Sequence, residues 1–332
     1  MRPQGRRLLA SLRRGVAFLG AALLVCALSA AAAPLRAAQM LRVGKAVGVA
    51  FSFVPLDIGI RKGLFAQNGL EIESTTFAGD ARMQQAMAAD SIDIALGSGP
   101  AMAFIAKGAP IKGIAAMAGA PLLLSLVVRP DGPKSLAELK GKTVSVSTAG
   151  SLTYWLVSET SRLQGWGPNG INIAPLGAPQ AQYVALERHD TDAMVADISS
   201  AFDMEKNGKA RILLRFGDLV KDFHIHVIFA TNKAIAARPE ALRAFLKGWF
   251  ATIAFMRANK AATVAIAMDV MNKDEAIISR SYDELMPMFS DDGKFNPKAL
   301  ATLAKSYVEL GVLPQEPDMS KLYTESFLPK NE

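Results

Sequence analysis

The segment FAGDARMQQAMAADSIDIALGSGP, residues 77–100, decides the fold class. Asp80 is a residue type that caps helices, and it follows a glycine turn, so a helix is predicted over residues 81–89. The apolar run 92–96 is typical of a short buried strand, and small residues then lead into another helix that ends at Lys107. A helix, a buried strand and a small-residue loop in close succession indicate an α/β protein.

This order of elements occurs twice along the chain. The first series of strands is predicted at residues 41–47, 70–77, 92–96, 111–117 and 122–128. After a boundary rich in Pro and Gly, the second series is predicted at residues 143–147, 192–196, 212–216 and 226–230. From Pro239 onward the pattern is almost entirely helical. We therefore expect two lobes with parallel sheets, and a ligand in a cleft beyond the carboxyl ends of their strands.

Residues 1–38 are typical of a secretory signal peptide. They hold six arginines and no acidic residue, and without them the formal net charge falls from +7 to +1. Their apolar stretch, 15–30, is shorter than the roughly 20 residues of a membrane span, and the alanines that follow offer cleavage sites. We expect cleavage and a periplasmic protein, with an uncleaved anchor as the alternative. The small remaining charge argues against a nucleic-acid partner.

Three stretches carry a resemblance to a known family. They are residues 77–100, the sequence IRKGLFAQNGL at 60–70 and the sequence SLAELKGKTV at 135–144. Together they resemble substrate-binding proteins of nitrate-, sulfonate- and taurine-type ABC importers, the group with sulfonate-binding and thiamine-precursor-like domains. The resemblance covers about residues 41–260.

The resemblance implies a type II periplasmic binding protein fold, a Venus flytrap in which the chain crosses twice between two lobes. The crossings are expected near Val127–Arg129 and Val227–Phe229. Lobe 1 is then expected at residues 41–127 plus 229–332, and lobe 2 at residues 128–228.

The resemblance also implies a small-molecule ligand and, as protein partners, an inner-membrane permease with its ATPase. No cofactor and no metal are expected, and the chain is expected to be a monomer. Two alternatives stay open: an enzyme on the same fold, thiamine-pyrimidine synthase-like or desulfinase-like, and a periplasmic sensor that presents its ligand to a receptor. Both enzyme chemistries use cysteine, and the chain's only cysteine, Cys26, lies in the predicted signal peptide. We therefore expect a binding protein rather than an enzyme.

The turn after the predicted strand 143–147 holds the sharpest ligand-binding candidates. Gly150 permits a tight turn, and Ser151 can cap the next helix, whose free N–H groups then point outward. That geometry binds an anionic or acceptor group, with capping alone as the alternative. The further candidates of lobe 2 are Thr148, Thr153, Tyr154 and, at the end of another strand, Asp197.

The matching turn of lobe 1 holds Gly79 and Asp80. Asp80 either caps its helix or binds an amine or hydroxyl of the ligand. The other candidates of this lobe follow two predicted strands, and they are Ser98, Gly99, Phe51, Ser52 and Phe53. The two rings either wall a ligand or pack in the core. The hydroxyls favour an oxyanion such as a sulfonate or carboxylate, whereas the aromatic residues favour a ligand with an apolar or aromatic body.

We predict a mature amino terminus between Ala33 and Met40, because cleavage follows the apolar core of a signal peptide. Intact-mass analysis of protein recovered from the periplasm measures this end directly. A full-length chain retained in the membrane would contradict the prediction.

Overall fold

The computed structural model describes residues 38–122 and 124–330. The predicted signal peptide, apart from Ala38, lies outside these residues, so its cleavage stays a prediction. Within the described part of the chain, none of the helices combines the length and the apolar character that crossing a bilayer requires. Both sheets of the fold belong to one compact unit that begins at Gln39.

The first sheet has the strand order β2-β1-β3-β10-β4. Its strands are β1 (Gln39–Lys45), β2 (Leu70–Thr76), β3 (Ile94–Ser98), β4 (Ile111–Ala118) and β10 (His226–Thr231). β1 is parallel to β2 and β3, whereas β10 is antiparallel to β3 and β4. The expectation of a purely parallel sheet is therefore wrong for β10, because this strand enters the sheet from the opposite end when the chain returns from the second sheet.

The second sheet repeats this arrangement in the order β7-β6-β8-β5-β9. Its strands are β5 (Leu124–Val128), β6 (Thr143–Val146), β7 (Asn172–Pro175), β8 (Ala193–Asp197) and β9 (Arg211–Arg215). β6 is parallel to β7 and β8, and β5 is antiparallel to β8 and β9. Each sheet thus contains one antiparallel strand that comes from the neighbouring part of the chain.

Strand β5 corrects the expected lobe boundaries. It was expected in lobe 1, but it forms hydrogen bonds only within the second sheet. The chain therefore passes between the sheets before Leu124, and it returns before His226, where β10 begins. The hydrophobic pattern could not show this, because the apolar runs of β4 and β5 look alike and neither indicates which sheet it joins. We propose residues 124–215 as the second lobe, and residues 39–118 and 226–330 as the first lobe.

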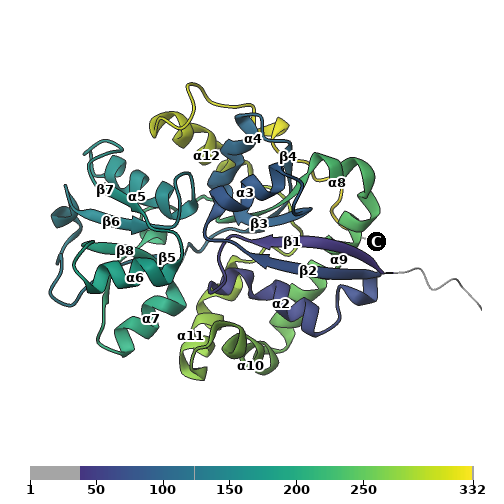
Figure 1. The fold of residues 1–332 in the computed structure, drawn as a ribbon, viewed down its shortest axis with the longest axis horizontal. Helices are drawn as coiled ribbons and strands as arrows, with labels where there is room; N and C mark the ends of the chain where they lie inside the picture. The colour runs from purple at the N-terminus through teal and green to yellow at the C-terminus, as the bar shows by residue number, and fades with distance from the viewer. Residues whose placement is uncertain (1–37, 123, 331–332) are drawn as a thin grey trace, which may run out of the picture. The chain divides into compact units, whose positions relative to one another are not determined.

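Helices cover both sheets, as Figure 1 shows for α5, α6 and α7 around the second sheet. The helices are α2 (Val54–Arg61), α3 (Asp80–Ala88), α4 (Met102–Ala106), α5 (Leu152–Leu163), α6 (Pro179–Glu187), α7 (Ile198–Lys206), α8 (Asn232–Ala237), α9 (Pro239–Ala258), α10 (Lys260–Met271), α11 (Glu275–Leu285) and α12 (Pro297–Glu309). Sequence reasoning did not predict β7, α7 or α8 as elements. β7 is short and only partly buried, so it lacks the apolar signal of an inner strand.

Helix α12 contacts α5 of the second lobe through a buried hydrogen bond. The indole Nε1 of Trp155 donates to the Ser306 hydroxyl at 2.8 Å, and both residues are at most 2% exposed. The Trp155 ring also packs against Phe223, with ring centroids 4.3 Å apart. Helix α12 therefore contacts α5 through one buried hydrogen bond, and Phe223, in the segment before β10, packs against the same indole ring.

We predict that Ser306→Ala lowers the free energy of unfolding by about 1–3 kcal/mol, because it leaves the indole N–H of Trp155 buried without an acceptor. Urea denaturation followed by circular dichroism measures the change. The exposed substitution Ser91→Ala serves as the control and should stay within about 0.5 kcal/mol of wild type. Equal free energies of unfolding for the two variants would show that the hydrogen bond between Trp155 and Ser306 does not stabilise the fold.

Candidate functional site

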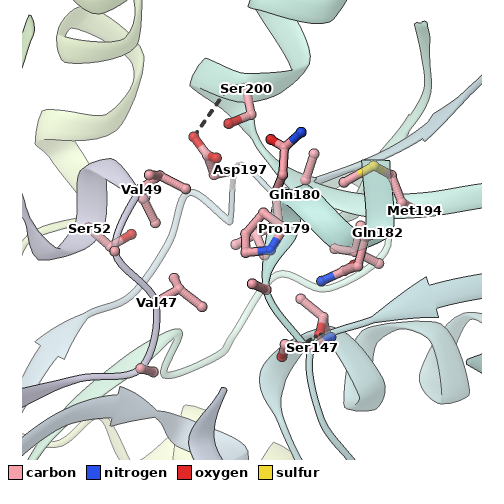
Figure 2. Close-up of a pocket in the computed structure, with 18 of the residues that line it drawn as sticks. Val47, Val49, Ser52, Ser147, Pro179, Gln180, Gln182, Met194, Asp197 and Ser200 are labelled. Carbon is pink, nitrogen blue, oxygen red and sulfur yellow. Dashed lines mark hydrogen bonds between the residues drawn. The ribbon is translucent and has the colours of Figure 1, made fainter. Parts of the chain in front are cut away.

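Loops from both sheets line a cavity of about 660 Å3. In each sheet these loops follow three of the four parallel strands, namely β1, β2 and β3 in the first and β6, β7 and β8 in the second. Figure 2 shows two walls that face each other, with Val47, Val49 and Ser52 on one and Pro179, Gln180 and Gln182 on the other. The cavity therefore lies beyond the carboxyl ends of the strands, where open α/β sheets bind ligands.

Much of the cavity wall is apolar. Both lobes contribute to it, with Ala46, Val47, Val49, Phe53, Phe77, Leu124, Leu152, Pro179, Met194, Val195 and Met271. Small-molecule sites usually have volumes of about 300–1,000 Å3 and combine an apolar wall with a few well-placed polar groups. The polar groups of this cavity therefore decide which ligands it can orient.

Four buried polar side chains of the first lobe line the cavity: Ser52, and three that we call the Asp80 cluster, namely Asp80, Ser98 and His226. The sheet register pairs Ser98, at the end of β3, with His226, at the start of β10. The Asp80 carboxylate accepts a hydrogen bond from the Ser98 N–H at 2.9 Å. Within the described residues, the Ser98 hydroxyl and Nδ1 of His226 have no hydrogen-bond partner. Both residues border the cavity, and these two atoms are themselves buried.

Burial sets the protonation of this cluster. It raises the pKa of Asp80, while hydrogen bonds from Ser98 and from the Leu152 N–H oppose the shift. It also lowers the pKa of His226 to about 4, so the imidazole is neutral at pH 7. Leu152 is the first residue of α5 in the second lobe. Asp80 of the first lobe thus lies at the positive end of a helix dipole from the opposite lobe.

The second lobe presents Asp197 to the cavity. Asp197 ends β8 and caps α7. Its Oδ1 accepts hydrogen bonds from the Ser199 N–H at 3.1 Å and from the Ser200 N–H at 3.2 Å, and Figure 2 shows the second of these. Burial raises the pKa of Asp197, against the opposing effect of Ser200 and of the Lys273 charge. Among the described residues, neither Asp80 nor Asp197 has an ion-pair partner, whereas Asp203 does.

Two reciprocal ion pairs join the lobes beside the cavity. Lys273, between α10 and α11, contacts Asp203 of α7 at 2.9 Å. Lys206 of α7 contacts Asp274 at 2.5 Å. The Lys273 side chain is only 11% exposed, whereas the side chains of the second pair are more than half exposed. Exposed pairs contribute about 0–1 kcal/mol, so the Lys273–Asp203 pair is the more effective contact between the lobes.

Several of the ligand-binding candidates line this cavity. They are Ser52, Phe53, Gly79, Asp80, Ser98, Thr153 and Asp197. The structure brings them together from loops that are distant in the sequence, and the role of each in ligand binding stays a prediction. Phe53 is 2% exposed and packs against His226, with ring centroids 4.8 Å apart, so it supports the wall from within the core.

The remaining candidates do not line the cavity. Phe51 is buried beside Phe289, with ring centroids 6.4 Å apart. Gly99 lies against the backbone of His224, whose carbonyl oxygen would be 2.0 Å from an added Cβ. Phe51 is apolar and Gly99 is small because of how each packs in the fold. The sequence alone does not distinguish such packing from contact with a ligand.

The turn of lobe 2 that follows β6 also differs from its expected role in ligand binding. Gly150 and Tyr154 face a separate small pocket of about 40 Å3 between α4, α5 and α12. The Ser151 hydroxyl accepts a hydrogen bond from the Tyr154 N–H at 3.2 Å, so it caps its own helix. The Thr148 hydroxyl accepts one from the Ala81 N–H at 3.4 Å, across the two lobes. These hydroxyls are therefore engaged by the chain itself.

Sequence reasoning missed some polar residues of the cavity. Gln182 is 2% exposed, and its Nε2 donates to the Gly177 carbonyl while Oε1 has no partner in the described part of the chain. Gln182 lies on a helix that carries no motif, so no local signal identifies it. His224 and His226 are two positions apart on a strand and share a face, a pattern that favours a structural or cleft-facing role over a metal site, and only His226 lines the cavity. The structure separates them: Nε2 of His224 accepts a hydrogen bond from the Asn296 N–H at 2.9 Å.

No group of three or more His, Cys, Asp or Glu side chains gathers in a metal-binding arrangement among residues 38–122 and 124–330.

A family model described as NMT1/THI5 like matches residues 50–263, which is more than half of the chain. The chain belongs to the NMT1/THI5-like family. The match includes the loops of both lobes that follow β2, β3, β6 and β8, so it covers most of the cavity.

Two solved structures show the same fold. The first is the alkanesulfonate-binding protein SsuA from Xanthomonas axonopodis pv. citri, solved with MOPS, which is 16% identical to this chain. The superposition covers 84% of this chain and 95% of that chain, with a TM-score of 0.72. The Candida albicans protein CA3427, described as exhibiting the generic periplasmic binding protein structural fold, is 15% identical, with 88% and 98% covered and a TM-score of 0.75. At such identities the likeness shows the fold, which confirms the expected periplasmic binding protein architecture.

A curated relative shares a shorter region. A putative thiamine biosynthesis protein from Haemophilus influenzae is 34% identical over 91 residues. The match spans 27% of this chain and 29% of the length of that relative.

We predict that Ser151→Ala lowers the free energy of unfolding by about 1 kcal/mol and leaves ligand affinity unchanged, because the hydroxyl caps α5 and does not line the cavity. A melting curve measures the change in stability, and a calorimetric titration with a confirmed ligand measures the affinity. A weaker Kd with unchanged stability would instead assign Ser151 to the ligand.

Proposed function

We propose that this member of the NMT1/THI5-like family is an exported solute-binding protein. It captures a small organic molecule with an apolar or aromatic body and delivers it to an ABC importer, formed by a permease and its ATPase. The observation that carries the proposal is the cavity of about 660 Å3 between the strand ends of two similar lobes. Its size, apolar wall and few convergent polar groups are those of a small-molecule site. The alkanesulfonate-binding protein SsuA, which has the same fold, supports it.

The lobes are arranged to close on a ligand by hinge rotation. The chain crosses between the sheets twice, before Leu124 and before His226. The other contacts between the lobes are side-chain contacts, such as the ion pair of Lys273 with Asp203. A rotation can break and remake such contacts without unfolding either lobe, which is the usual basis of hinge motion.

We also propose that the protein releases its ligand unchanged. Cys26, the chain's only cysteine, precedes the described residues, so no thiol nucleophile lines the cavity. The imidazole of His226 is buried and neutral, and its pKa of about 4 makes it a weak base.

We predict that a ligand found in a thermal-shift screen raises Tm and lowers the radius of gyration, because it binds the native state and draws the lobes together. The screen contains small amines, amino-heterocycles, carboxylates, sulfonates and uncharged aromatic compounds. Small-angle scattering with and without the best compound measures the radius, and mass spectrometry measures whether that compound is recovered intact.

A matched pair of substitutions locates the binding. Val47→Trp should fill part of the cavity and abolish the Tm shift, whereas Val308→Trp, at a position that is 38% exposed on α12, should preserve it. The proposal fails if no compound binds, if Val47→Trp binds as well as wild type, or if the compound is converted to product.

A further inference from the structure

The positive ends of the helices that face the cavity are occupied by oxygen atoms of the chain itself. The Thr148 hydroxyl accepts a hydrogen bond from the first turn of α3. The Ser151 hydroxyl accepts a hydrogen bond from the Tyr154 N–H in the first turn of α5. Asp197 accepts two hydrogen bonds from the first turn of α7. A free helix amino terminus is a common site for oxyanions, and these three are already filled.

The charges around the cavity also disfavour an anion. Three carboxylates line it, from Asp80, Asp197 and Asp203, and two ammonium groups, from Lys209 and Lys273. Lys273 is paired with Asp203, and the exposed Lys209 places its Nζ over the Tyr183 ring, 5.2 Å from the ring centroid. No arginine is among the lining residues of the described chain. The two carboxylates that lack an ion-pair partner, Asp80 and Asp197, come from opposite lobes.

Buried polar atoms without a partner point to a ligand in the same place. The Ser98 hydroxyl and Nδ1 of His226 line the cavity beside Asp80, and their residues are 1% and 6% exposed. Oε1 of Gln182 lines the opposite side and also lacks a partner within the described residues. Leaving such groups unpaired costs about 1–3 kcal/mol each, and a ligand with matching polar atoms removes that penalty.

We propose that the ligand carries a cationic or hydrogen-bond-donating nitrogen, which Asp80 or Asp197 accepts, and that sulfonates and carboxylates are excluded. This inference rests on the proposed solute-binding function and names its substrate class. Asp80 is the main determinant of ligand class, because it is buried and adjoins the Ser98 hydroxyl and Nδ1 of His226, which have no hydrogen-bond partner among the described residues. An oxyanion in the same place would find no arginine among the lining residues of the described chain, whereas a cationic nitrogen would stabilise the charged form of Asp80 against the burial that raises the pKa of this carboxyl.

This inference corrects the expectation of an oxyanion ligand at the lobe 2 turn, which rested on free N–H groups at the start of α5. The sequence could not show that Asp80, 72 positions earlier than Leu152, lies at that helix end. The expectation of an apolar or aromatic ligand body is unaffected, since the wall remains mostly apolar.

The test compares two matched sets of probes by calorimetric titration. The first set is benzylamine, benzamidine and 4-aminopyrimidine, and the second is benzoate, benzenesulfonate and methanesulfonate, together with the best compound of each class from the thermal-shift screen. We expect measurable Kd values only for nitrogen compounds. Asp80→Asn should raise those Kd values about ten- to hundredfold, because a hydrogen bond to a charged group is lost.

The control is Asp190→Asn, which makes the same change in net charge at an exposed position outside the cavity. It should leave every Kd unchanged. Asp197→Asn gives a second variant that keeps the helix cap, because asparagine caps helices as well as aspartate does. Tight binding of a sulfonate or carboxylate that survives Asp80→Asn overturns this inference but leaves the solute-binding function standing. Absence of binding by every probe and screen compound overturns both.

Discussion

A buried carboxylate without a counter-ion needs hydrogen-bond donors around it, and the donors to Asp80 come from both lobes. The Ser98 N–H belongs to the first sheet, whereas the Leu152 N–H begins a helix of the second lobe. This one side chain therefore couples the lobes at the cavity. The start of α5 is capped by the Ser151 hydroxyl, so the proposed preference for a nitrogen-bearing ligand is consistent with the contacts at this end of the helix.

The strand order of the two sheets determines where the cavity lies. In both sheets the parallel strands end at the cavity, and the single antiparallel strand begins there, so each sheet contributes its loops to one place. That is how His226 comes to lie next to Ser98, although 128 positions separate them. Helix α12 and the loop at Lys273 add further contacts to the second lobe.

The sequence predicted most of the helices and strands, because apolar periodicity, proline at helix starts and glycine turns are local signals. It could not predict which sheet β5 joins or that β10 is antiparallel, because both depend on pairing between distant segments. In the site, Asp80, Ser98 and Asp197 were predicted to follow strands, and they do. The signal at Ser151 was equally clear, yet its hydroxyl caps α5, because a cap and a ligand contact have the same sequence pattern.

The central claim is that one ligand bridges the two lobes between Asp80 and Asp197. A crystal structure of the protein with the tightest-binding compound tests it most directly. The account predicts density for the ligand in the cavity, with a ligand nitrogen within hydrogen-bond distance of the Asp80 or Asp197 carboxylate and with contacts to both sheets. Density at another surface, or an oxyanion bound at the start of α5 after displacing Asp80, would contradict the account.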